Sequence, residues 1–181
     1  MCRNDKSLSQ RSSGAAHRVA LVFFVFVALG LWPAAWPDSR VPWLGSQAAL
    51  AKMARDTVWL VTGGKEIPIE VEIAATAEES ALGLMYRTEL PENQGMLFPS
   101  LYPRELSMWM RNTFIPLDMV FIRADGVVHW IEAMTEPHSE AIISSNGLVL
   151  AVLELKGGAA ARFGLKAGDV VKHATFAAAK R

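Results

Sequence analysis

Hydrophobic and polar residues alternate most regularly between Ile67 and Ile73. A period of two predicts a strand with one buried face and one exposed face. The glycine pair Gly63-Gly64 comes just before this segment, so we expect the segment to form a hairpin with a strand at 57–61. Hydrophobic runs bounded by turn residues predict five further strands, at 105–110, 117–123, 127–133, 148–155 and 170–173.

Two short helices are expected beside these strands. Thr76 and Glu79 have the spacing of a capping box, which predicts a helix over 77–86. A second helix is predicted at 159–163, before Gly164. The remaining segments are expected to be an apolar plug and two loops, at 96–99, 100–104 and 135–145. Together the elements predict a compact single α+β domain that is mainly β, with about seven short strands in a partly open, barrel-like sheet and one or two short helices.

The amino-terminal part of the chain differs from this body. Basic residues outnumber acidic ones in residues 1–18, and residues 19–31 form a hydrophobic run without charge. The run has the length of a signal-peptide core, and its extension to Trp36 approaches the length of a membrane span. Because the basic residues precede the run, they should stay in the cytoplasm and the body should cross the membrane.

We therefore predict three regions. Residues 1–36 are expected to be a signal peptide or an N-terminal membrane anchor, residues 37–51 a linker, and residues 52–181 the folded domain. The protein is expected to be exported, and to be either periplasmic or attached to the cytoplasmic membrane with its body outside.

Charge and cysteine content exclude several kinds of site. The chain has 18 basic and 18 acidic residues and a formal net charge of +0, which does not favour a nucleic-acid partner. Its single cysteine, Cys2, precedes the hydrophobic run. The body therefore has no disulfide, no cysteine nucleophile and no cysteine metal ligand. We predict no metal and no cofactor.

Two predicted strands are apolar except for one carboxylate residue in each. Asp118 and Glu154 each interrupt a predicted apolar strand. A carboxylate in such a strand must be exposed, paired or hydrogen-bonded, because burying it bare is too costly. We expect a structural ion pair, for example Arg87 with one of the two carboxylates. Two alternatives remain: the carboxylates are the acid and base of a hydrolase, or an arginine, Arg87 or Arg111, clamps an anionic ligand.

A polar insert, Arg111-Asn112-Thr113, stands between two apolar runs. Asn and Thr commonly satisfy the backbone where a strand breaks. With Trp109 they could instead line the mouth of a pocket that has an aromatic wall and polar donors. The candidate ligand-binding residues are therefore Arg87, Trp109, Asn112, Thr113, Asp118 and Glu154.

The methionines suggest a further alternative. Five of the chain's eight methionines lie between Met85 and Met119. Methionine usually fills gaps in a core. Thioethers also bind Cu(I), so Met108 and Met110 could make the protein a periplasmic Cu(I) carrier.

Histidines and glutamates gather between residues 129 and 140. His129 and Glu132 would point to opposite faces of a strand, so their spacing is poor for a shared metal. We expect a solvated acidic loop, in which His138 has no metal-binding role.

Short motifs follow one another along the body: GLMYR at 83–87, GMLF at 95–98, WMRNTFIPLD at 109–118, LEL at 153–155 and GLKAGD at 164–169. This series resembles the DUF192 family of bacterial and archaeal proteins, over about Val71 to Lys172. The resemblance implies a small β-rich fold and an extracytoplasmic location, and it implies no reaction.

The residues and the resemblance together predict a non-catalytic binding module of the cell envelope. Its partner is expected to be a small polar ligand, a peptide or an envelope protein, bound near Trp109, Asn112 and Asp118. The membrane would be a further partner through the N-terminal segment, if that segment is not cleaved.

Overall fold

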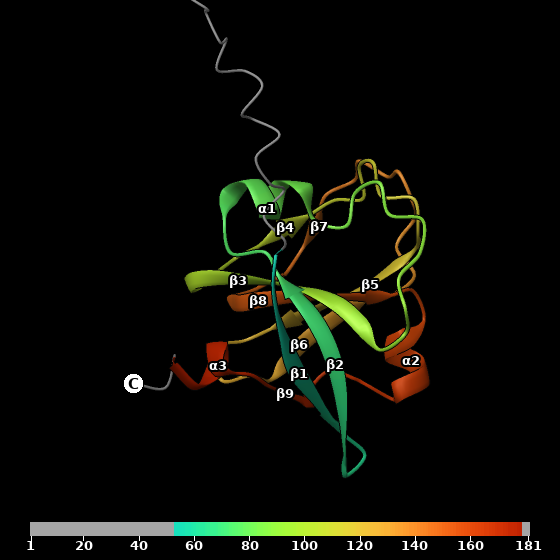
Figure 1. Ribbon diagram of the computed structural model, residues 1–181. Helices are drawn as coiled ribbons and strands as arrows, with labels where there is room; N and C mark the ends of the chain where they lie inside the picture. Colours follow the sequence, from blue (N-terminus) through green and yellow to red (C-terminus); the bar gives the residue numbers. More distant parts are fainter. Residues whose placement is uncertain (1–52, 179–181) are drawn as a thin grey trace, which may run out of the picture. The chain divides into compact units, whose positions relative to one another are not determined.

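Seven strands form one curled sheet in the order β6-β5-β8-β3-β2-β1-β9 (Figure 1). The computed structural model describes residues 53–178, so the predicted leader at 1–36 and linker at 37–51 lie outside the described residues. The strands of this sheet are β1 (Ala54–Thr62), β2 (Lys65–Ile73), β3 (Gln94–Arg104), β5 (Leu117–Ile122), β6 (Val128–Glu132), β8 (Val149–Lys156) and β9 (Val170–Lys172). The other elements are the two-stranded ribbon of β4 (Ser107–Met108) and β7 (Ile143–Ser144), and the helices α1 (Ala77–Leu82), α2 (Ala159–Phe163) and α3 (Ala174–Ala178).

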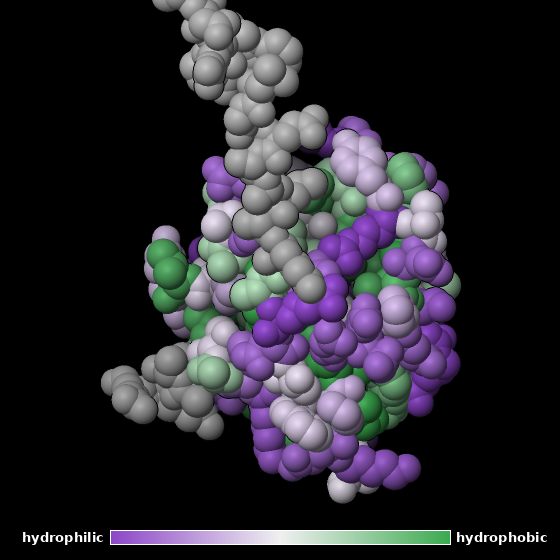
Figure 2. Space-filling model, in the orientation of Figure 1, coloured by the Kyte–Doolittle hydropathy of each residue, from purple (hydrophilic) through white to green (hydrophobic). Residues whose placement is uncertain are grey.

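The β1–β2 hairpin follows directly from the alternation in the sequence. The two strands pair antiparallel along their whole length, on either side of the predicted glycine turn. Ile69 and Val71 are fully buried, whereas Glu70 points to the other side of the sheet and is exposed. Figure 2 shows mainly hydrophilic residues over this hairpin. The predicted half-buried strand is confirmed.

Strand β3 differs from the sequence prediction. The sequence predicts a plug at 96–99 and a loop at 100–104, but one strand runs from Gln94 to Arg104. This strand pairs with β2 in parallel and with β8 antiparallel. Its apolar run is therefore buried on both faces, and such runs show no alternation in the sequence. The predicted loop is present only as a register shift between Pro99 and Arg104.

Helix α1 is shorter than predicted. The capping box is present, because the Glu79 N–H donates to Thr76 Oγ1 (3.1 Å) and the Thr76 N–H donates to Glu79 Oε2 (2.9 Å). The helix nevertheless ends at Leu82 instead of residue 86, because Gly83 takes a φ of 49°, which stops a right-handed helix. Helix α2 has the predicted bounds. Helix α3 lies in a tail for which the sequence predicts no helix.

The two edge strands of the sheet meet at one end. Val127, just before β6, forms a bridge with Val170 at the start of β9. The Val128 N–H donates to the carbonyl of Asp169 at 2.8 Å. The sheet thereby curls into a half-barrel. The predicted fold class, a mainly β α+β domain with a partly open, barrel-like sheet, is confirmed.

Hydrophobic residues are buried on both faces of the sheet. The first core lies under α2 and α3, and it includes Leu97, Val120, Leu153, Ala159 and Phe176. The second core is covered by the loops that follow α1 and β4, and it includes Leu84, Leu90, Met96, Met110 and Met119. Successive side chains of a strand point to opposite faces, so one step along β5 or β8 moves a side chain from one core to the other. Among the described residues, no helix is long and apolar enough to cross a membrane.

Candidate functional site

The register between β5 and β8 separates the two carboxylates. Asp118 lies opposite Leu155, and Met119 lies opposite Glu154. Residues opposite each other share a face, so Asp118 points into the first core and Glu154 into the second. A hydrolase would need both carboxyl groups in one cleft, as acid and base. The pair therefore cannot serve as acid and base at one substrate, and the hydrolase hypothesis is wrong for it.

Asp118 is held by the backbone. Its side chain is fully buried, and its carboxylate accepts three N–H bonds, from Met134 (2.8 Å), Gly158 (2.9 Å) and Ala160 (2.8 Å). Such bonds satisfy a buried carboxylate without a cation. The predicted ion pair with Arg87 does not form. Asp118 instead ties the loop after β6 to the start of α2.

Glu154 lies in an apolar environment. It stands opposite Met96 on one neighbouring strand and Met119 on the other, and it is 4% exposed. Within residues 53–178 its carboxyl group takes part in no hydrogen bond or ion pair. Burial raises the pKa of Glu154 to about 8. The group is therefore mainly a neutral acid at pH values below that pKa.

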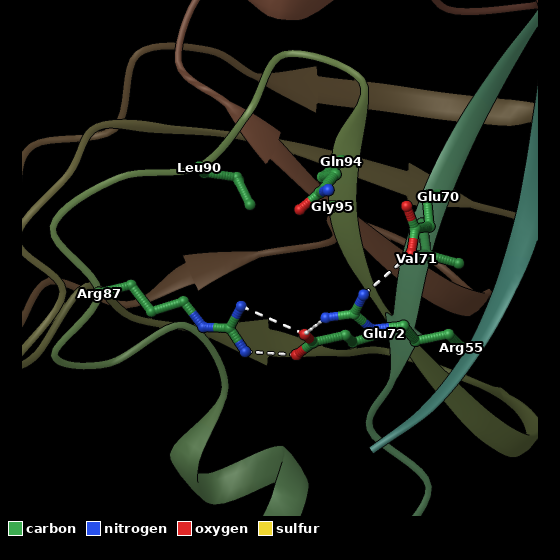
Figure 3. Close-up of a pocket in the computed structure, with 8 residues that line it drawn as sticks. All are labelled: Arg55, Glu70, Val71, Glu72, Arg87, Leu90, Gln94 and Gly95. Carbon is green, nitrogen blue, oxygen red and sulfur yellow. Dashed lines mark hydrogen bonds and ion pairs between the residues drawn. The ribbon is translucent and has the colours of Figure 1, made fainter. Parts of the chain in front are cut away.

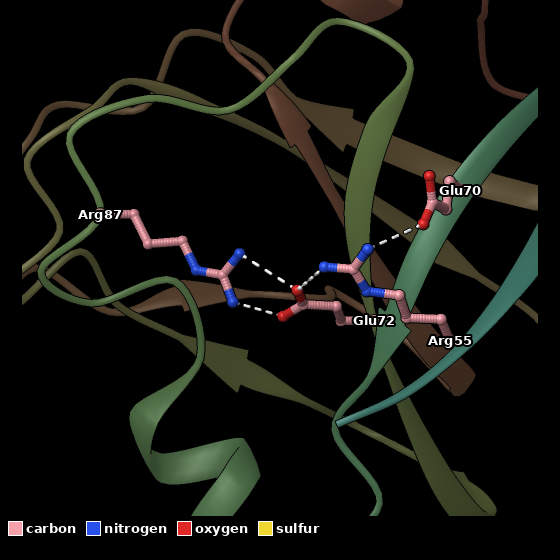
Figure 4. Close-up of polar contacts among 4 residues, drawn as sticks. All are labelled: Arg55, Glu70, Glu72 and Arg87. Carbon is pink, nitrogen blue, oxygen red and sulfur yellow. Dashed lines mark hydrogen bonds and ion pairs between the residues drawn. The ribbon is translucent and has the colours of Figure 1, made fainter. Parts of the chain in front are cut away.

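Arg87 binds a carboxylate that the sequence does not single out. It reaches from the loop after α1 to Glu72 on β2, which also accepts from Arg55 Nη2 at 3.2 Å (Figure 4). Arg55 Nη1 donates to Glu70 at 3.0 Å. Burial by itself raises the pKa of Glu72, but the hydrogen bonds and charges of Arg87 and Arg55 outweigh it, so this pKa lies below its usual value. The arrangement is a clasp that fastens a loop to the sheet.

The cavity beside this clasp is too small for a ligand. Its volume is about 10 Å³, and Val71, Leu90, Gln94 and Gly95 complete its wall (Figure 3). About one water molecule needs that much space. The contact that the structure gives Arg87 here is the ion pair that joins its loop to the sheet.

Three loop segments are joined by backbone hydrogen bonds above the second core. The Tyr86 N–H donates to the carbonyl of Asn112 (2.9 Å), and the His138 N–H donates to the carbonyl of Thr113 (3.1 Å). A turn closed by the Thr113 N–H and the carbonyl of Met110 (3.0 Å) lies between them. This turn explains why the strand predicted at 105–110 is reduced to β4.

Aromatic side chains cover these segments. We call the group made of Tyr86, Asn112, Phe114 and His138 the aromatic platform. The Tyr86 and Phe114 rings meet edge to face with centroids 6.0 Å apart, and the Phe114 and His138 rings lie 5.1 Å apart. The Asn112 amide donates to the Tyr86 hydroxyl at 3.1 Å. Tyr86 is 60% exposed and Phe114 is 43% exposed. The platform is therefore an ordered surface of large rings open to solvent.

The backbone of the platform is strained. Tyr86, Asn112 and His138 have φ values of 64°, 57° and 63°. Non-glycine residues rarely adopt such values, and each costs about 1–3 kcal/mol. Asparagine tolerates this conformation best, while a bulky tyrosine does so rarely. Residues in such conformations cluster at functional sites.

The structure distributes the six predicted site residues over several places. Asn112 belongs to the platform. Trp109 is 45% exposed beside it in the chain, with the Arg111 guanidinium 5.5 Å from its ring centroid. Thr113 is 4% exposed and cannot line a pocket mouth. Arg87 is in the clasp, and Asp118 and Glu154 lie in the two cores.

Sequence reasoning missed three platform residues. The sequence places Tyr86 inside a predicted helix and His138 in a predicted solvated loop, and no local pattern marks Phe114 as a site residue. The sequence signal for this site would have been large aromatic residues together with the turn at Asn112. Tyr86 and His138, however, lie far from that turn in the chain. Only the loop-to-loop hydrogen bonds bring them together.

The two methionines of the copper hypothesis contribute to packing. Met110 is fully buried, and its sulfur lies 3.1 Å from the Thr135 hydroxyl. Met108 packs against the second core. The copper hypothesis stays a prediction, and packing is the role that the contacts support.

Comparison with known proteins places the chain in a family. The family model DUF192, described as "Uncharacterized ACR", matches residues 58–173. A Sinorhizobium meliloti 1021 protein, whose crystal structure is described as that of a "putative transcription regulator", is 41% identical with a TM-score of 0.67, and the match covers 68% of this chain and 97% of that chain. A protein of unknown function from Novosphingobium aromaticivorans DSM 12444 is 40% identical with a TM-score of 0.66, over 68% of this chain and 89% of that chain. No functionally curated protein matches. The chain belongs to the DUF192 family.

Proposed function

We propose that this protein is a non-catalytic binding module of the cell envelope that recognises a peptide segment of a partner through the aromatic platform. The observation that carries the proposal is the arrangement of Tyr86 and Phe114. Both rings are exposed, both contact a second ring, and both stand on loops that are hydrogen-bonded to one another. Such rings supply large contact areas at a low entropic cost.

The fixed backbone supports recognition. A surface that is already ordered loses little conformational entropy when a partner binds. The clasp at Arg87 fastens the loop that carries Tyr86 to the sheet. The three hydrogen bonds to Asp118 fasten the loop after β6, which carries His138, to β5 and α2. These two predicted residues therefore support the site without contacting the partner.

A peptide fits the surface better than a nucleic acid does. Large exposed rings are typical anchors of protein–protein contacts. The balanced charge, with 18 basic and 18 acidic residues, does not provide the positive surface that phosphate backbones require.

Selection from a random peptide library against the purified full-length chain tests the proposal. We expect selected peptides to bind Tyr86→Ala and Phe114→Ala about tenfold or more weakly, because each loss removes an aromatic anchor. Asn112→Gly keeps the left-handed turn and removes the side-chain amide. This variant therefore tests whether the amide contacts the peptide, without changing the backbone conformation of the turn. Fluorescence polarisation measures the affinities.

Tyr102→Ala is the matched control for Tyr86→Ala. Tyr102 is 63% exposed, close to the 60% of Tyr86, but it lies on β3. Its removal should leave peptide affinity unchanged. Equal losses at both tyrosines, or peptides that ignore Tyr86 and Phe114, would show that the platform is not the site.

The envelope location is the second part of the proposal, and it rests on the charge and hydrophobic pattern of residues 1–36. Alkaline phosphatase fused after residue 181 is active only outside the cytoplasm. We expect activity from the full-length fusion in a bacterial host, and loss of activity when residues 19–31 are deleted. An inactive full-length fusion, made in the same amount, would refute export.

A further inference from the structure

Residues 100–103 of β3 form a projecting apolar segment, which we call the β3 tip. Leu101 is 98% exposed and Tyr102 is 63% exposed. The tip lies within the register shift between Pro99 and Arg104, where no partner residue on β8 is paired with it. Figure 2 shows hydrophobic residues that project at the edge of the molecule where Figure 1 places β3.

The tip has a defined conformation. The Ser100 hydroxyl donates to the carbonyl of Tyr102 at 2.9 Å, and Arg104 Nε donates to the same hydroxyl at 3.0 Å. Two prolines, at 99 and 103, restrict the backbone on either side of Leu101 and Tyr102. These contacts and the two prolines hold the segment in a conformation in which the side chains of Leu101 and Tyr102 are exposed.

Other apolar surface lies next to the tip. Leu148 is 66% exposed and precedes Val149, which pairs with Arg104. An open groove of about 340 Å³ separates the tip from the start of α1. Neighbouring exposed apolar residues mark a contact with a partner or a membrane more often than scattered ones do.

The tip lies at the end of the sheet where the chain enters the domain. β1 begins at Ala54, which pairs with Ile73 at the end of β2. Ile73 in turn pairs with Leu97, a few residues before the tip, on the parallel strand β3. The β1–β2 turn at Gly63-Gly64 lies at the opposite end of these strands (Figure 1).

We propose that the β3 tip is a membrane-contact element that places Leu101 and Tyr102 in the interface of a lipid bilayer. Leucine enters the acyl region, tyrosine stays at the headgroup level, and the nearby Arg104 meets lipid phosphates. The inference rests on the envelope location in the proposed function, because the bilayer is the one that the hydrophobic run would occupy.

Chain geometry favours this partner over a soluble one. Residues 37–51 lie between the predicted anchor and the domain, and even fully extended they reach at most about 50 Å. An anchored domain is therefore held close to lipid, and the end that carries Met53 is joined to the linker. Leu101 and Tyr102 are exposed apolar side chains near that end.

Fluorescence quenching on the full-length chain tests the inference. Cys2 is replaced by serine, and one new cysteine is introduced by Leu101→Cys or, as control, by Lys65→Cys beside the opposite turn. Both positions are exposed, so a polarity-sensitive fluorophore fits at either. The labelled chains are reconstituted into vesicles of phosphatidylethanolamine and phosphatidylglycerol that contain spin-labelled lipid. Flotation shows separately whether the chain is anchored.

We expect the label at position 101 to be quenched severalfold more by spin-labelled lipid than the label at position 65, and to be shielded from iodide in the water. An anchored chain with equal quenching at the two positions would overturn the membrane contact and leave the anchor intact. Quenching at 101 in a chain without residues 1–51 would support the contact even if the anchor proposal failed. A chain that neither floats nor is quenched would overturn both.

Discussion

Replacing Glu154 with glutamine is expected to make the domain more stable than wild type by up to about 4–5 kcal/mol at about pH 9, and to change little at about pH 4. Glu154 is buried between Met96 and Met119, where burial raises its pKa to about 8 from a usual value of 4.5. Glutamine has nearly the same shape as the neutral acid and does not ionise. The substitution therefore removes only the cost of ionisation.

The direction of the effect follows from proton binding. Between the unfolded pKa of 4.5 and the folded pKa of about 8, the folded state holds a proton that the unfolded state has lost. Raising the pH through this window therefore lowers the free energy of unfolding of the wild type. The loss is about 1.4 kcal/mol for each pH unit, so the whole window gives about 4–5 kcal/mol as an upper value.

Urea unfolding of both proteins across this pH range measures the effect. The difference between them should grow steadily with pH and level off above about pH 8. Glu66→Gln is the control, because Glu66 is exposed on β2 with its carboxylate paired to Lys172. A constant difference between Glu154→Gln and wild type would show that the carboxyl group is solvated.

Asp118→Asn should lower the free energy of unfolding by about 3 kcal/mol at neutral pH. The carboxylate accepts three backbone N–H bonds with both of its oxygens. An asparagine amide places a donor against one of these N–H groups, so a buried donor loses its partner. The remaining bonds also lose the negative charge that strengthened them.

Chemical denaturation of Asp118→Asn beside wild type measures this loss. Asp125→Asn is a suitable comparison, since Asp125 is half-exposed and paired with Arg123, and such a surface pair contributes at most about 1 kcal/mol. Hydrogen exchange should also speed up at Met134 and Ala160. An unchanged unfolding midpoint would mean that Asp118 is kept for a ligand, and our assignment of it as a structural residue would be wrong.

Local patterns in the sequence predicted much of the fold. The alternation at 67–73, the glycine turn before it and the capping box at Thr76 are all present as expected. Each depends on residues close together in the chain, where sterics and hydrogen bonding act directly. The predicted strands β5, β6 and β8 are likewise present, with shifts of at most one residue at their ends.

The sequence marked the two carboxylates as unusual for their strands, but their burial and their surroundings came from the structure. Apolar neighbours show that Asp118 and Glu154 interrupt hydrophobic strands, but they do not decide whether either side chain points inward. Their faces depend on the register between β5 and β8, and their partners come from other segments. The sequence therefore suggested an ion pair with Arg87, whereas Arg87 pairs with Glu72.

In the candidate site, too, some residues are indicated by the sequence and others only by the structure. The sequence singled out Asn112 as a polar residue at a strand break and Trp109 as the aromatic wall of a pocket mouth. It did not identify Tyr86, Phe114 and His138 as their neighbours, because no local pattern encodes a contact between loops. The sequence by itself determined the family, most strands of the sheet, the glycine turn of the first hairpin and the position of a carboxylate within two apolar strands. Only the tertiary structure decided which side chains meet, because strand register and loop contacts are set by packing between segments distant in the chain.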